Sequence, residues 1–129
     1  MDPPKELAGA EYVSLETFRR NGDPVDTTVW VVEDGGVLYV RTSPQSGKAK
    51  RIRRNNHVRI ARSNMRGKVS GEWADGEAMV LEGKDSERIV GLFRKKYGLQ
   101  IKLLGALGRL RRGPRVEQVV IGIRLQKSG

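Results

Sequence analysis

Two tight-turn signals in the first third of the chain frame a run of β-branched residues. The first is NGDP at 21–24, because Asn-Gly tolerates positive φ and proline fixes the direction in which the chain leaves the turn. The second is DGG at 34–36. The run between them, VDTTVWVVE at 25–33, is typical of a strand, and further strands are expected at 15–19 and 37–41. Three strands joined by two short turns predict an antiparallel meander.

The middle of the chain continues in short elements. Residues 48–56 have helical propensity and no breaker, which predicts a short helix whose one apolar residue, Ile52, faces inward. Residues 58–62 alternate in character, as those of a strand do. Residues 68–73 and 77–82 are expected to form a strand pair around the ADG turn that separates them.

The apolar period then changes to a helical one. Ile89, Phe93 and Tyr97 recur at i, i+4 and i+8, which predicts a helix from a capping Asp or Ser at 85–86 to Tyr97, where the next glycine can end it. A second, weaker helix is predicted from the leucines Leu103, Leu104, Leu107 and Leu110. A strand at 116–125 closes the chain. The predicted fold is a mainly β, mostly antiparallel barrel with one or two helices in its C-terminal half.

Length and charge limit the classes of protein that the chain can represent. Its 129 residues predict one domain at 11–129, preceded by a loose arm at 1–10. The net charge of +10 indicates a polyanionic partner: nucleic acid, an anionic membrane or a multiply charged small molecule. The lack of cysteine excludes disulfides and thiolate metal sites. A signal-peptide core and an apolar run of about 18 residues are also missing, so a cytoplasmic protein with no membrane span is expected.

The sequence offers no recognisable set of acid–base or metal-binding residues. His57 is the only histidine, stands among arginines and asparagines, and is interpreted as a surface residue. No histidines or carboxylates have the spacing of metal ligands, so no metal is expected. The catalytic residues stay unassigned, and if the chain is an enzyme, a cofactor is expected to carry the reaction.

The segment RTSPQSGKAKRIRRNNHV at 41–58 combines the features of an anion site. Thr42 and Ser46 offer hydroxyl donors. Gly47 lets the backbone approach a ligand, and Lys48 adds a compact charge. From the residues alone, the segment is a solvated cationic face, a nucleic-acid surface or a phosphate site. It has no interleaved aromatic residues for base stacking, which counts against nucleic acid.

Residues 25–58 resemble the flavin-binding half of the pyridoxamine 5'-phosphate oxidase-like family. In that family two strands meet across a short turn, a hydroxyl residue ends the second strand, and Ser-x-Lys and a short helix follow. The corresponding sequences here are VDTTVWVVEDGGVLYVRT, SPQSGK and AKRIRRNNHV. The resemblance implies a split β-barrel, a homodimer, and a cofactor phosphate held by Thr42, Ser46 and Lys48. The opening arginine of the oxidase pattern would fall at Asp26, so oxidation of pyridoxamine phosphate itself is not expected.

One subgroup of this family, oxidoreductases that use the deazaflavin coenzyme F-420, is similar to the chain over nearly its whole length. The similar sequences are YVSLETFRRNGDPVDTTVWVV, YVRTSPQSGKAKRIRRN and RGKVSGEW. The resemblance implies hydride transfer from F-420 to a small electron-poor acceptor, with the cofactor at the dimer interface. The phosphodiester and oligoglutamate tail of F-420 suit the net charge of +10, and the candidate partners of these anions are Lys50, Arg51, Arg53 and Arg54.

Two alternatives to F-420 stay open. FMN would use the same pocket of Thr42, Ser46 and Lys48, but it has no use for so much additional positive charge. A non-catalytic barrel of the same fold would sequester a flavin-like cofactor or bind nucleic acid through its basic face.

The resemblance also places residues next to the cofactor ring. Val29, Trp30 and Val31 lie on the strand that would flank it, although core packing explains Trp30 equally well. Arg41 is expected either at the pyrimidine edge of the ring or in solvent.

Large apolar residues elsewhere are given structural roles. Trp73, Met65 and Met79 are expected to fill the barrel or the dimer interface. The segment 99–112 is expected to pack on the core, and the alternatives are a lid over the site and a basic amphipathic helix.

Overall fold

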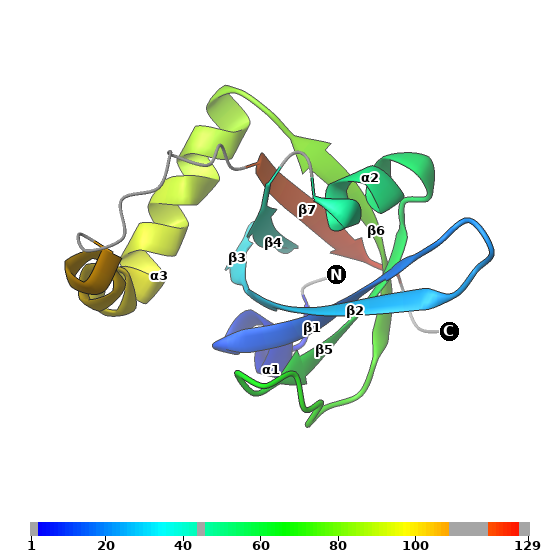
Figure 1. Ribbon diagram of the computed structural model, residues 1–129, viewed down its shortest axis with the longest axis horizontal. Helices are drawn as coiled ribbons and strands as arrows, with labels where there is room; N and C mark the ends of the chain where they lie inside the picture. Colours follow the sequence, from blue (N-terminus) through cyan, green and yellow to red (C-terminus); the bar gives the residue numbers. More distant parts are fainter. Residues whose placement is uncertain (1–2, 44–45, 109–118, 127–129) are drawn as a thin grey trace.

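One curled antiparallel sheet forms the body of the protein, as a computed structural model shows (Figure 1). The structure describes residues 3–43, 46–108 and 119–126. The strands are β1 (Tyr12–Phe18), β2 (Pro24–Trp30), β3 (Val32–Asp34), β4 (Val37–Thr42), β5 (His57–Ser63), β6 (Ala74–Leu81) and β7 (Val119–Leu125). The helices are α1 (Lys5–Ala8), α2 (Gly47–Arg54) and α3 (Lys84–Gly108). The mainly β, antiparallel fold expected from the sequence is confirmed.

The strand order explains how the sheet curls into a split barrel. The order is β2-β1-β5-β6-β7-β4-β3, and each neighbouring pair is antiparallel. β2 and β3 follow each other in the chain with only Val31 between them, and yet they lie at the two edges of the sheet. The sheet must therefore bend until its edges approach each other. Both turn signals form hairpins as predicted, but the three-strand meander is wrong, because β2 and β3 pair with different neighbours.

The second predicted strand is broken at Val31, whose backbone is held by side chains of α3. Val31 N–H donates to the Tyr97 hydroxyl at 3.0 Å, and this hydroxyl lies 2.8 Å from the carbonyl oxygens of Val31 and Glu11. Lys96 Nζ donates to the carbonyl oxygens of Val31 and Ala10 at 2.7 and 2.6 Å. A neighbouring strand would normally satisfy such buried backbone groups. Here one helix does so, which allows the chain to pass from one sheet edge to the other.

Two apolar clusters pack the fold. The interior of the barrel is filled by side chains that include Leu15, Leu38, Ile60, Ile121 and Ile123. A second cluster joins α3 to the sheet and consists of Val32, Tyr39, Ile89, Phe93, Tyr97 and Val120. The predicted helical stripe of α3 is therefore confirmed. Ile52 of α2 is buried in the first cluster, as expected.

The strand pair expected at 68–73 and 77–82 is wrong. A single strand, β6, runs from Ala74 to Leu81 and pairs with β5 and β7. Gly76 lies in the interior of this strand, where a Cβ atom would come within 2.9 Å of the Arg124 carbonyl oxygen. Glycine at this position permits a close approach of β6 to β7 rather than a turn.

Helix α3 is longer than the sequence suggests. It runs from Lys84 to Gly108 and continues through Gly98, the expected stop. A glycine ends a helix most readily at positive φ, but the described glycines with positive φ do not include Gly98. The side chains of residues 99–108 and all of 109–118 lie outside the described part of the structure. The packing of the leucine stripe and the role of 99–112 therefore stay predictions.

Residues 3–10, the described part of the predicted loose arm, pack onto the barrel. Leu7 in α1 is 1% exposed and Ala10 is 0% exposed, and both belong to the barrel core. The Ala10 carbonyl oxygen also accepts the hydrogen bond from Lys96 described above. The short, proline-led segment thus brings an apolar side chain into the core, a role that its sequence does not reveal.

Candidate functional site

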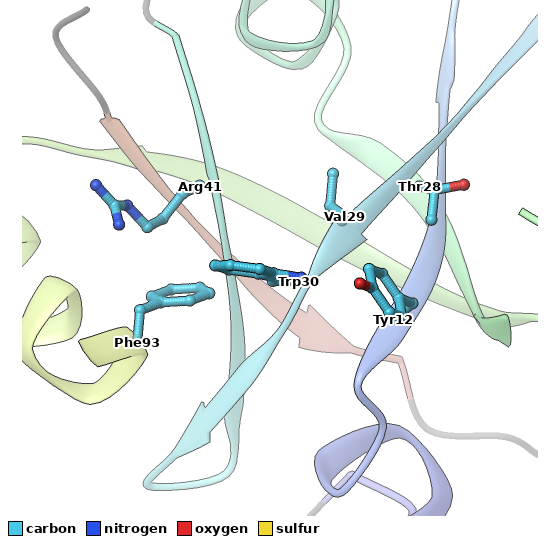
Figure 2. A pocket seen from close by; sticks show the side chains of 6 residues that line it. All are labelled: Tyr12, Thr28, Val29, Trp30, Arg41 and Phe93. Atoms are coloured by element: carbon cyan, nitrogen blue, oxygen red, sulfur yellow. The ribbon is translucent and has the colours of Figure 1, made fainter. Parts of the chain in front are cut away.

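An open cavity of about 420 Å³ lies where β1, β2, β4 and α3 come together (Figure 2). Its wall is formed by Tyr12, Thr28, Val29, Trp30, Arg41 and Phe93. Figure 2 shows Trp30 in the middle of this wall, with Arg41 and Phe93 to one side and Tyr12 to the other. Small-molecule sites commonly measure about 300–1,000 Å³, so the cavity has the size of a ligand site.

Trp30 gives the cavity a planar apolar surface. Its indole stacks on Tyr97, with ring centroids 4.4 Å apart and an interplanar angle of 3°. Such pairs contribute about 0.5–1.5 kcal/mol beyond the area that they bury. The neighbouring Val31 is anchored by the same tyrosine, so both the ring and the backbone of Trp30 are fixed. Trp30 therefore combines core packing with a place in the cavity wall.

Arg41 brings an unused hydrogen-bond donor to the cavity. Its Nε is buried and has no hydrogen-bond partner among the described residues. Its guanidinium carbon lies 5.8 Å from the centre of the Phe93 ring. Burial, and then the nearby Arg94, lower the pKa of Arg41 from its usual value. Leaving a buried donor unpaired costs about 1–3 kcal/mol, so an oxygen of a ligand that reaches Nε would be bound favourably.

Two of the predicted phosphate residues meet at the end of β4. The Thr42 hydroxyl donates to Ser46 Oγ at 2.8 Å. Ser46 Oγ also accepts from the Ala49 N–H at 3.1 Å and thereby caps α2. A hydroxyl accepts two hydrogen bonds and donates one, so Ser46 keeps its O–H for a ligand. Phosphate binding by this pair stays a prediction.

Four cations lie on α2 or next to it and are called here the cation cluster: Arg19, Lys48, Arg51 and Arg54. Burial, and then Arg51, lower the pKa of Lys48. Burial, and then Arg19 and Arg54, lower the pKa of Arg51, whose Nε donates to the Thr17 hydroxyl at 2.7 Å. Within the described ranges none of the four forms an ion pair with a carboxylate. A bound anion would relieve their mutual repulsion.

Three other predicted site residues lie elsewhere. Lys50 is exposed on α2, and Arg53, also exposed, lies 3.9 Å from the Glu82 carboxylate. Val31 is 0% exposed and belongs to the barrel core, not to the cavity wall. Gly47 lies against the end of the Arg51 side chain, and a Cβ atom there would lie 2.6 Å from an Nη atom of that arginine.

Strand β1 connects the cavity to the cation cluster. Tyr12 at its start lines the cavity, and Thr17 near its end holds Arg51. At about 3.3 Å per residue, these two positions lie roughly 17 Å apart. Thr28 in the cavity wall pairs with Ser14, which is only about 10 Å from Thr17 on the same measure. Tyr12 and Thr17 are five residues apart, so their side chains point to opposite faces of β1. A ligand that used both features would be elongated and would pass around the sheet edge at β2, with a planar part at one end and anionic groups at the other.

Sequence reasoning missed Tyr12, Thr28 and Phe93 as cavity residues. Phe93 belongs to the helical stripe, which indicated burial but not that its ring also meets a cavity. Tyr12 lies before the first predicted strand, although counting back from the NGDP turn pairs it with Trp30, as the structure does. This cross-strand pairing with Trp30 was the sequence signal that could have placed Tyr12 at the cavity.

The aromatic and sulfur residues expected in packing roles lie outside the barrel interior. Trp73 is half-buried, with the Arg59 guanidinium carbon 5.0 Å from its ring centre. Met65 and Met79 are 68% and 62% exposed, so the barrel-filling role is wrong for both. A place in a dimer interface stays a prediction for them.

His57 lies at the surface, away from the cavity. Its Nε2 is 3.2 Å from the Asp75 carboxylate, and its ring stacks on Phe18. Among the residues that the structure describes, no histidines, cysteines or carboxylates form a group able to hold a metal ion. In the same residues, no helix has both the length and the apolarity to cross a membrane.

Comparison with known proteins identifies the fold. No family model and no curated protein matches the chain. A candidate pyridoxamine 5'-phosphate oxidase from Listeria innocua is 19% identical over 95% of this chain and 89% of its own, with a TM-score of 0.66. An F420 reductase is 17% identical over 98% of this chain and 96% of its own, with a TM-score of 0.61. The heme storage protein HutZ from Vibrio cholerae is 13% identical over 96% of this chain and 87% of its own, with a TM-score of 0.69. The chain therefore has the split β-barrel fold of the pyridoxamine 5'-phosphate oxidase-like proteins.

Proposed function

We propose that the chain binds coenzyme F-420 and transfers hydride between this cofactor and a small electron-poor acceptor. The observation that supports this function best is the pairing of a cavity for a planar ring with a separate cluster of unpaired cations. The two features lie roughly 10–17 Å apart along β1, on opposite faces of this strand. F-420 has this shape, since its deazaflavin ring is joined through a phosphodiester to an acidic tail.

The cavity residues would hold the ring. Val29 and Trp30 flank it, and the unused Nε–H of Arg41 donates to an oxygen of its pyrimidine edge. When bound, the deazaflavin supplies a hydride to the acceptor. The chain itself orients the ring, limits the access of other acceptors and places a positive charge near the pyrimidine edge. No side chain is assigned as a general acid or base in this step.

The cation cluster and the start of α2 would hold the anionic part of the cofactor. Lys48 and Arg51 bind the phosphodiester together with the free O–H of Ser46, which Thr42 positions. The exposed Arg54 extends the positive surface towards the acidic tail. Each of these contacts neutralises a cation that has no carboxylate partner among the described residues.

A matched pair of lysine variants tests this assignment. Lys48→Ala and Lys50→Ala remove the same charge from the same helix, but only Lys48 is half-buried and next to Arg51. We expect Lys48→Ala to weaken F-420 binding by 10-fold or more, as for the loss of a charge-assisted hydrogen bond, and Lys50→Ala to weaken it less than 3-fold. Quenching of F-420 fluorescence gives both constants. Equal losses would show that the protein attracts the cofactor only through its net charge.

We also propose that the chain forms a homodimer with the cavity at the interface. The cavity is open in the single chain, and Met65 and Met79 expose apolar surface that a second copy would cover. Light scattering of the purified protein measures the mass directly. A mass of one chain, unchanged by F-420, would contradict this part of the proposal.

FMN is the second candidate cofactor, since its flavin ring and single phosphate fit the same cavity and Ser46 loop. Tight FMN binding without a response to F-420 would replace the first proposal by this one. A carrier without an acceptor is the non-catalytic alternative, and it predicts binding of F-420 with no turnover. A nucleic-acid surface predicts binding of a random oligonucleotide that falls steeply with added salt.

Heme storage, the function named for the neighbour HutZ, has less support in this chain. The only histidine, His57, is outside the cavity wall and is engaged by Asp75. Histidine is a common axial ligand of heme iron. A titration with hemin that gives no Soret shift is the expected result.

A further inference from the structure

We infer that Tyr12 makes the cavity selective for a ring with an oxygen at the end opposite its pyrimidine edge. The deazaflavin of F-420 carries a hydroxyl there, whereas the flavin of FMN carries methyl groups. This inference rests on the proposed function and deepens it by naming the residue that separates the two cofactors.

Tyr12 has an unused hydroxyl in the cavity wall. It is the cross-strand partner of Trp30 in the β1–β2 hairpin, so its ring is fixed next to the planar surface. Figure 2 shows the Tyr12 hydroxyl directed towards Trp30. Within the described residues this hydroxyl forms no hydrogen bond, in contrast to the Tyr97 hydroxyl, which serves Val31 and Glu11. It is therefore available to a ligand.

The second polar group of the cavity lies across Trp30 from Tyr12. Figure 2 shows Arg41 on one side of the indole and Tyr12 on the other, and both line the same cavity. A planar ring lying over Trp30 thus meets a cationic donor at one end and a phenol at the other. The carbonyl oxygens of a pyrimidine edge suit the cation. The opposite end of the ring then faces Tyr12.

The chemistry of that opposite end decides the preference. A ring hydroxyl or its anion accepts the Tyr12 O–H, and an ionised oxygen accepts it more strongly than a neutral one. A methyl group accepts nothing and removes the tyrosine hydroxyl from water. Tyr12 therefore favours the hydroxylated ring by the effect of one hydrogen bond and disfavours the methylated ring by loss of solvation. The acidic tail plays no part in this distinction.

The test compares Tyr12→Phe with the wild-type protein on both cofactors. The substitution keeps the aromatic ring and removes one oxygen. We expect the dissociation constant for F-420 to rise about 10-fold, and that for FMN to fall, because the variant has no hydroxyl to remove from water. Because each cofactor is compared with itself, differences in phosphate and tail cancel. F-420 binding is followed by its own fluorescence and FMN binding by quenching of flavin emission.

The control variant is Arg41→Met, which is expected to weaken both cofactors to a similar extent, because both carry a pyrimidine edge. Equal changes for both cofactors on Tyr12→Phe, or no change for either, would overturn the inference and leave the proposed function intact. Failure of wild-type protein to bind F-420 would overturn both. If Tyr12→Phe does not fold, Tyr12→His, which keeps a ring and a donor, decides: retained preference supports the inference and lost preference contradicts it.

Discussion

The hydroxyl of Tyr97 is the most sharply testable feature of the fold. It is the acceptor for the Val31 N–H at the point where the chain passes from β2 to β3. Tyr97→Phe removes this acceptor and keeps the ring that stacks on Trp30 at 4.4 Å. The carbonyl oxygen of Val31 keeps its bond from Lys96. The variant therefore deprives one buried N–H, on a residue with 0% exposure, of its acceptor, and also removes the hydroxyl that lies 2.8 Å from the Glu11 carbonyl oxygen.

The structure sets the size of the effect. A buried donor left unsatisfied costs about 1–3 kcal/mol. For a domain of this length, 1 kcal/mol corresponds to roughly 4 °C in the melting temperature. We expect Tyr97→Phe to melt about 4–12 °C below the wild-type protein. Tyr97→Leu should lose a further 0.5–1.5 kcal/mol or so, because the stacking with Trp30 is lost as well.

Calorimetry or circular dichroism measures the transition, and Tyr12→Phe is the matched control. That variant deletes the same atom from a tyrosine whose hydroxyl has no partner among the described residues, so its free energy of unfolding should change by less than about 0.5 kcal/mol. Similar losses in the two variants would refute the account of the Val31 break. So would a Tyr97→Phe protein as stable as the wild type.

The same residue predicts a pH dependence. Burial raises the pKa of Tyr97 from 10.0 to about 12, against a smaller opposing effect of the Val31 backbone hydrogen bond. A pKa raised on folding gives stability that is complete below the unfolded value and is lost as the pH rises through the folded value. Wild-type stability should thus fall between about pH 10 and pH 12 more steeply than that of Tyr97→Phe. Parallel curves would contradict the burial of this hydroxyl.

Three further substitutions have defined outcomes. Gly76→Ala should destabilise the fold by about 1–3 kcal/mol, because its Cβ would lie 2.9 Å from the Arg124 carbonyl oxygen. Gly91→Ala, whose Cβ on α3 would have nothing within 4 Å, should stabilise the fold by about 0.5–1 kcal/mol. Chemical denaturation measures the free energy of unfolding of both variants. Burial, and then its cross-strand neighbour Asp26, raise the pKa of Glu16, so wild-type stability should decline as the pH rises above the ordinary carboxyl range, and Glu16→Gln should flatten that decline. A steeper decline in the variant would contradict this sign.

Local pattern was enough to predict the elements whose partners are close in sequence. The two hairpins follow from NGDP and DGG, whose glycines at 22, 35 and 36 adopt positive φ. The spacing of Ile89, Phe93 and Tyr97 predicted the buried face of α3. In both cases a short stretch of chain determines the geometry: turn conformation sets the hairpins, and helical period sets the buried face of α3.

Contacts between distant residues decide what the sequence could not show. The run at 25–33 is rich in β-branched residues on both sides of Val31, and its break there depends on Tyr97, 66 residues away. The glycine at 76 is a close contact between strands, and a glycine in a turn has the same appearance in sequence. The cavity combines residues of four elements, and of these Val29, Trp30 and Arg41 were anticipated through the family resemblance, whereas Tyr12, Thr28 and Phe93 were not.

The cation cluster illustrates the same limit for the site. The sequence groups Lys48, Lys50 and Arg51 together, but the turn of α2 leaves Lys50 exposed and brings Arg51 to Thr17 on β1. Arg19, from the turn of the first hairpin, then completes the cluster. Helical period separates residues that are adjacent in sequence, and tertiary folding adds a residue from far away.

The central claim is that the cavity and the cation cluster form one site for an elongated, anionic ring cofactor. Titration of F-420 into the wild-type protein, Arg41→Met and Lys48→Ala tests it most directly, because the two residues lie on different elements. The account predicts saturable quenching of F-420 fluorescence in the wild-type protein and a loss of affinity of 10-fold or more in each variant, with Lys50→Ala, which should lose less than 3-fold, as the control. Binding that survives both substitutions, or no binding by the wild-type protein, would contradict it.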